Sequence, residues 1–212
     1  MTDEARPLFA HNEPGPRFTA KDMSQALTRL GLDYPTANAR IASYAKHGWI
    51  YVREKGAGAT SPNKFALADL AAAVLLSAVQ DTGMADRSIL AKIASGIYGW
   101  VEGAKCTTHH PTLAALVESI NGEHSWQLQV DFYRDLQTGE RKVQAQLYRA
   151  GETDPNVYVE PDAVKRIRAE HPNVQIELDP RVDSNAWPVA TIQIPAATHL
   201  MRLSAFVAQP GN

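Results

Sequence analysis

Small, hydroxyl-bearing and cationic side chains recur at helical spacing in segment 36–47. Drawn as a helix at about 100° per residue, this segment places Ala37, Ile41 and Tyr44 on one side, which we expect to pack inward. The outward side and its flanks hold Thr36, Asn38, Ala39, Arg40, Ser43 and Lys46. Guanidinium, hydroxyl and methyl groups can contact base edges in the major groove of DNA. These residues, with Tyr44 at their border, are therefore candidate DNA contacts, the alternative being an ordinary solvated helix face.

Basic side chains also bracket the glycine-rich segment 56–63. Arg53, Lys55 and Lys64 flank this segment, and Ser61 lies within it. These side chains, and the backbone N–H groups of a glycine-rich tip, can donate hydrogen bonds to phosphate oxygens. The glycines do not continue as the dinucleotide-binding pattern G-x-G-x-x-G, because position 61 is serine. We expect a phosphate-contacting loop here, and a solvated hairpin end is the alternative.

Two short helices joined by a tight link must hold the first candidate face. Thr19 and Asp22 form a capping-box pattern that predicts a helix over 20–30. A second helix is predicted over 36–47, because a proline begins it and a glycine follows it. Thr19 and Lys21, at the start of the first helix, complete the set of candidate DNA contacts.

A β-hairpin and two further helices are predicted next. Residues 49–55 alternate as in a strand, 56–63 are turn formers, and 64–67 can return as a second strand. Residues 68–80 are apolar on nearly all sides, so this helix should be covered from several directions, and another helix is predicted over 87–98. The order helix, turn, helix, wing, helix is that of a winged helix-turn-helix.

The second half mixes helical and alternating patterns, which predicts a small α+β unit with an antiparallel sheet. Helices are predicted over 111–120 and 161–170, and strands over 126–132, 143–147, 158–160, 174–178 and 190–194. The turn formers at 137–140 favour a hairpin between two of these strands. The predicted fold class is thus α+β, divided into a flexible arm over 1–17, a winged-helix domain over 18–98, a helical connector over 99–123 and an oligomerisation or effector domain over 124–212.

Four short motifs stand at the borders of the first-half elements. They are Phe18-Thr-Ala-Lys, Tyr44 followed by Gly48-Trp49-Ile50, Phe65-Ala-Leu-Ala-Asp69-Leu70 and Gly83-Met84. With these motifs the chain resembles the MerR-like superfamily of winged DNA-binding domains over about residues 18–93. The resemblance implies a helix that docks in the major groove, a wing on the DNA backbone and a role in transcription regulation.

The chain also departs from that family. Ala42 and Ser43 stand where the family usually has an arginine and a tyrosine on the DNA backbone, and no long heptad helix follows the domain. Excisionases and phage terminase small subunits have the same winged core. A phage-type packaging or recombination adaptor, which would be an assembly module, therefore remains the alternative to a regulator.

Composition and charge set broader limits. The chain of 212 residues has a net charge of −2, with 44% hydrophobic and 21% charged residues, which is typical of a globular protein. Residues 17–65 carry eight Lys and Arg against three Asp and Glu, a local excess of five positive charges that can steer a polyanion. We find no membrane span and no secretory signal, and the single cysteine indicates a reducing, cytoplasmic setting.

Other constellations give weaker indications. Cys106, His109 and His110 supply at most three metal ligands, so an exposed polar loop is the favoured interpretation and no metal or cofactor is expected. Catalytic motifs are missing, and we do not expect an enzyme. Aromatic residues of the second half can line a small-molecule or protein effector site, although they more often form a core. A single module contacts few phosphates, so a homodimer on double-stranded DNA is expected.

Overall fold

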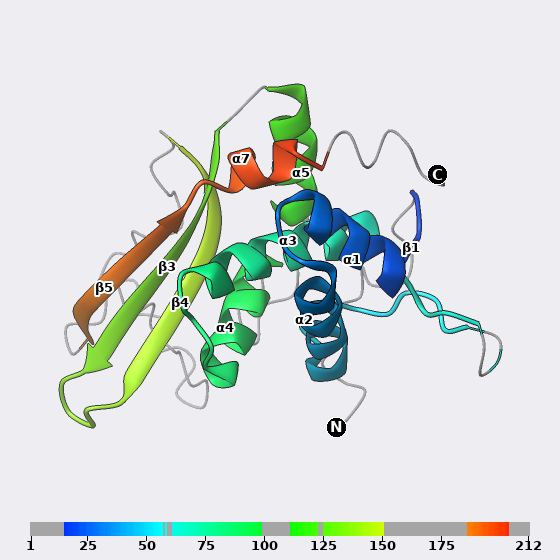
Figure 1. Ribbon diagram of the computed structural model, residues 1–212. Helices are drawn as coiled ribbons and strands as arrows, with labels where there is room; N and C mark the ends of the chain where they lie inside the picture. Colours follow the sequence, from blue (N-terminus) through cyan, green and yellow to red (C-terminus); the bar gives the residue numbers. More distant parts are fainter. Residues whose placement is uncertain are drawn as a thin grey trace, which may run out of the picture.

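The computed structural model describes residues 15–56, 58, 61–98, 111–122, 125–150 and 186–203. These residues form helices and two small antiparallel sheets, so the α+β class is confirmed (Figure 1). The predicted elements over 158–160, 161–170 and 174–178 lie outside the described residues. The same holds for Cys106, His109 and His110.

The first two predicted helices are present, and the second begins two residues before the predicted start at 36. Helix α1 spans Ala20–Arg29, and its capping box joins the Thr19 hydroxyl to the Asp22 N–H and the Asp22 carboxylate to the Thr19 N–H. Helix α2 spans Tyr34–His47, and the side chain of Asp33 caps it by accepting from the Thr36 N–H at 2.9 Å. Both predictions are confirmed.

The predicted strand over 49–55 is wrong. Strand β2 (Lys64–Phe65) pairs with β1 (Phe18–Thr19), and only an isolated bridge joins Glu54 to Lys64. The physical reason is that Trp49 and Ile50 are both buried, at 6% and 1% exposure, so two successive side chains enter the core where a strand would alternate.

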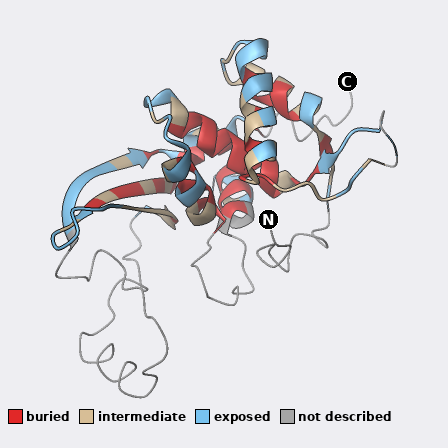
Figure 2. Cartoon of the chain, turned by 90° about the horizontal axis from the view of Figure 1, so that it is seen from below, coloured by how far each residue is buried: buried red, intermediate tan, exposed pale blue. Residues whose placement is uncertain are grey.

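Helix α3 (Leu67–Asp81) is the centre of the core. Every residue from Ala68 to Val79 is buried, as the all-round apolar pattern predicts. Helices α1, α2 and α4 (Arg87–Ile97) contact it, and two further helices from the second half of the chain also pack on it. Figure 2 shows these buried residues gathered at the middle of the helical part.

The second half adds a sheet and two helices. Strands β3 (Trp126–Asp135), β4 (Arg141–Arg149) and β5 (Ala186–Ile194) form an antiparallel sheet in the order β4-β3-β5. The hairpin between β3 and β4 is confirmed, as is a strand that includes the predicted range 190–194. Helix α5 (Pro111–Asn121) matches its prediction, whereas α7 (Ala196–Met201) was not predicted.

The sheet and the helical part share one core. Leu116, Leu128 and Leu200 belong to the same buried cluster as the residues of α3 and α4. The predicted domain boundary between residues 98 and 99 therefore does not separate two hydrophobic cores. Helix α4 lies so close to β4 that a Cβ added to Gly96 would be 2.0 Å from the carbonyl oxygen of Ala145.

This close approach gives the first testable prediction. Helix propensity alone would make Gly96→Ala stabilising by about 1 kcal/mol. We expect the opposite sign, a loss of about 1–3 kcal/mol in the free energy of unfolding, because the methyl group meets strand backbone that cannot move alone. Urea unfolding measures the change, with Lys92→Ala on the exposed side of the same helix as the control. A Gly96→Ala protein as stable as the parent would contradict this account.

Candidate nucleic-acid interface

The outward face of α2 is exposed, as predicted. Ala37, Ile41 and Tyr44 are each at 0% exposure on the inner side of the helix. The outer side is open to solvent at Thr36, Asn38, Ala39, Ala42 and Lys46, and Ser43 is half-buried. The chain thus leaves a helix face of small and polar side chains uncovered, with one lysine near its carboxyl end.

Two of the predicted contact residues on α2 are engaged inside the protein. Arg40 donates to the Ser77 carbonyl at 3.0 Å and to the Ser77 hydroxyl at 2.6 Å, and its guanidinium pairs with Asp81 at 2.7 Å. The Tyr44 hydroxyl donates to Gln80, and burial raises the pKa of this hydroxyl above its usual range. Both side chains therefore fasten α2 to α3. Helical spacing alone could not reveal this, because it places residues on a face without identifying their neighbours.

Arg53 has a similar internal role. Its guanidinium forms a two-point ion pair with Asp69, with Nε and Nη2 at 2.7 and 3.1 Å from the carboxylate oxygens. The side chains of Arg53 and Asp69 are only 2% and 0% exposed. This corrects the expectation that Arg53 lies on the surface of the 53–64 segment, and Arg53 is not carried forward as a phosphate contact.

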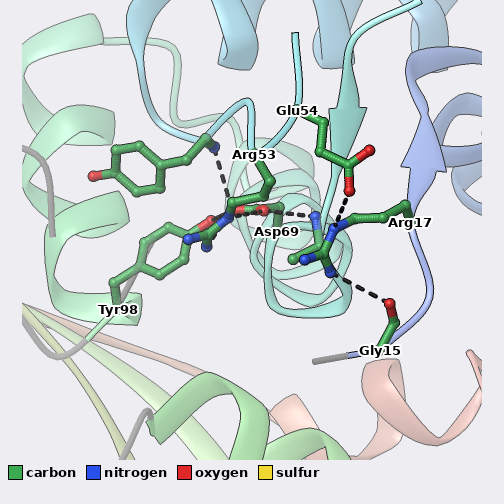
Figure 3. Close-up of polar contacts among 8 residues, drawn as sticks. Gly15, Arg17, Arg53, Glu54, Asp69 and Tyr98 are labelled. Atoms are coloured by element: carbon green, nitrogen blue, oxygen red, sulfur yellow. Dashed lines mark hydrogen bonds and ion pairs between the residues drawn. The ribbon is translucent and has the colours of Figure 1, made fainter. Parts of the chain in front are cut away.

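The Asp69 carboxylate holds together several elements (Figure 3). Besides Arg53, it accepts hydrogen bonds from the Tyr98 hydroxyl at 2.7 Å and from the backbone N–H groups of Tyr51 and Ala66 at 3.2 and 2.9 Å. Burial, and then the nearby Asp69 charge, raise the pKa of the Tyr98 hydroxyl well above its usual range. Asp69 and Tyr98 are not among the residues predicted from the sequence to form a site. In the sequence, the only indication of this role is that Asp69 belongs to the motif over residues 65–70 that leads into α3.

The base of the 53–64 segment has a second, exposed ion-pair cluster. Glu54 pairs with Arg17 at 3.1 Å and with Lys64 at 3.2 Å (Figure 3 labels Arg17 and Glu54). The Lys64 ammonium, and less strongly the Arg17 guanidinium, lower the pKa of the Glu54 carboxyl. Lys64 is thus exposed as predicted, but its charge is partly neutralised by Glu54.

The remaining predicted cations face solvent. Lys21, Lys46 and Lys55 are exposed, and no ion pair joins any of them to another residue in the described parts of the chain. Ser61 is also exposed, whereas the Thr19 hydroxyl is occupied by the capping box. These three lysines are the cations of the region that remain available to a polyanion.

The start of α1, the end of α2 and the 53–64 segment meet around one hollow. The hollow has a volume of about 520 Å³ and is lined by Thr19, Ala20, Lys21, Ala45, Pro62, Asn63 and Phe65. It brings the predicted residues Thr19 and Lys21 beside the end of α2 and the returning arm of the segment. Thr36 and Asn38, in the first turns of α2, do not line it.

Comparisons with known protein families, with curated proteins and with solved structures found no match. None of the described helices is long and apolar enough to cross a membrane. Among the described residues no group of three or more His, Cys, Asp and Glu is placed to hold a metal ion.

The buried ion pair of Asp69 predicts a large effect of a small substitution. Asp69→Asn keeps the side-chain size but leaves the Arg53 charge buried without a counter-ion, so we expect the free energy of unfolding to fall by about 3–5 kcal/mol. The matched control is Asp81→Asn on the same helix, whose carboxylate is 54% exposed and pairs with Arg40, with an expected loss of about 0–1 kcal/mol. Equal losses in the two variants, measured by urea unfolding, would refute the structural role of Asp69.

The buried tyrosines predict a loss of stability at alkaline pH. The pKa of Tyr44 is raised in the folded chain, whereas an unfolded tyrosine ionises near pH of about 10. The sign follows from linkage: the stabilisation is complete below about pH 10 and falls above it, because only the unfolded chain releases the proton. Urea unfolding from about pH 9 to about pH 11 should therefore give a shallower fall for Tyr44→Phe than for the parent. An unchanged pH dependence in that variant would contradict the burial of this hydroxyl.

Proposed function

We propose that the chain binds double-stranded DNA in a sequence-specific manner and acts as a transcriptional regulator. The observation that carries this proposal is the uncovered face of α2, where Asn38, Ala39 and Ser43 lie on a helix already fixed to the core on its other side. In the proposed complex this face enters the major groove, which is wide enough for an α-helix. Small side chains favour it because they allow the helix backbone to approach the bases closely.

The arrangement of α1, α2 and the 53–64 segment supports a winged helix-turn-helix mode of binding. In this mode the 53–64 segment lies along the DNA backbone, and the phosphate contacts come from Lys21, Lys46 and Lys55. Three such contacts provide modest affinity, so a homodimer that contacts two half-sites is part of the proposal. A cytoplasmic location is part of the proposal, because a chain with a single cysteine suits a reducing compartment.

A second candidate function is an assembly adaptor of the phage packaging or recombination type. One specific observation favours it: Glu54 pairs with both Lys64 and Arg17, which lowers the positive charge at the base of the segment that would otherwise hold phosphates. A protein partner tolerates a loop of lowered positive charge better than a polyanion does. This candidate predicts binding to a protein through the same α2 face without sequence-specific affinity for DNA.

Selection from a pool of random DNA duplexes, followed by affinity measurements at two salt concentrations, tests the proposal. Ala39→Leu should reduce the affinity for the selected sequence by at least about tenfold, because the larger side chain prevents close approach to the bases. Lys46→Ala and Lys55→Ala should weaken binding to all sequences and lower the salt dependence by about one unit each.

Two controls on α4 match these variants. Ala91→Leu and Lys92→Ala alter exposed residues of another helix and should leave the affinity unchanged. If the α2 variants select and bind duplexes as the parent does, or if no sequence is enriched, the proposal fails and the adaptor candidate takes its place.

A further inference from the structure

The end of the three-stranded sheet that lies away from α5 and α7 carries an unusual row of side chains. Trp187 of β5 lies opposite Arg134 of β3, which in turn lies opposite Arg141 of β4. Directly opposite residues of adjacent strands point to the same face, with Cβ atoms about 4.5–5.5 Å apart. The row therefore places one indole and two guanidinium groups side by side across three strands.

All three side chains are open to solvent. Trp187 is 62% exposed, which is unusual for the largest apolar side chain, and both arginines are exposed. The row continues the face on which Phe132 and Val143 pack against the core, but it lies at the end of the sheet that projects past the helices (Figures 1 and 2). The core does not account for these residue types.

The charges at this end of the sheet are separated between its two faces. Asp135 follows Arg134 in β3, so alternation directs its side chain to the other face, where it pairs with Lys142 at 3.2 Å. Neither Arg134 nor Arg141 has an ion pair with any residue within the described ranges. Like charges directly opposite each other destabilise a sheet, so this row lowers stability unless an anion binds to it.

We propose that this row is a second nucleic-acid contact, which binds single-stranded DNA or RNA by stacking a base on Trp187 and holding phosphates with Arg134 and Arg141. The occupant must combine an anionic backbone with flat aromatic groups, because the row combines two cations with an exposed indole. A single strand meets both requirements, whereas the bases of a duplex are stacked on each other and closed to the indole. An acidic peptide would meet only the requirement for negative charge.

Fluorescence anisotropy with a labelled oligothymidine at low salt tests this surface on the full chain. Trp187→Ala should weaken binding about tenfold, within the range of one base stacked on an aromatic ring, and Trp187→Phe should retain most of the affinity. The double variant Arg134→Ala and Arg141→Ala should weaken binding and lower the salt dependence by about 0.7 for each phosphate that is no longer neutralised. Trp187 is exposed, so its variants should unfold at the same urea concentration as the parent. The double arginine variant should be at least as stable as the parent, because it removes the repulsion between two opposed like charges.

Three controls separate this inference from its alternatives. Arg87→Ala removes an exposed cation elsewhere, and Leu136→Ala removes an exposed apolar side chain at the same end of the sheet, so both should bind as the parent does. Ala39→Leu on α2 should also leave oligothymidine binding unchanged, which distinguishes failure of this inference from failure of the duplex-binding proposal. Equal affinity for an abasic oligomer, equally effective displacement by polyglutamate, or no effect of the row variants would each overturn the inference.

Discussion

The position of the candidate interface depends on the contacts of one buried carboxylate, that of Asp69. It lies at 0% exposure at the start of α3 and accepts from the guanidinium of Arg53, the hydroxyl of Tyr98 and two backbone N–H groups. A buried charge is tolerated only when it is paired and fully hydrogen-bonded. The base of the 53–64 segment must therefore stay against α3 and α4, and this fixes the direction in which the segment leaves the core.

Ion pairs within the protein also explain which of the predicted cations remain available in solvent. Arg40 and Arg53, the two arginines among the predicted contacts, join α2 and the 53–64 segment to α3. Lys21, Lys46 and Lys55 are exposed to solvent. Because Arg40 and Arg53 are bound to other residues of the protein, sequence specificity in the proposed complex comes from the small and amide side chains of α2.

One continuous core carries both proposed nucleic-acid surfaces. Helix α3 is covered by elements from both halves of the chain, and α4 touches β4 at backbone distance at Gly96. The α2 face and the row of Trp187, Arg134 and Arg141 are thus parts of one packed body. A protein with a duplex-binding face and a single-strand contact on one core would suit DNA that is opened near its binding site.

Much of the secondary structure follows from the sequence alone, because it depends on residues that are close together in the chain. The capping box at Thr19, the buried side of α2, the all-round burial of α3 and the hairpin of β3 and β4 follow from periodicity and turn residues, and each is present. Tertiary structure decided the partners: β2 pairs with β1, residues 49–55 contribute only an isolated bridge at Glu54, and Arg53 pairs with Asp69 sixteen residues away. Periodicity shows which face of an element is buried, whereas the identity of a contact depends on how distant elements pack, and no spacing along the chain encodes that packing.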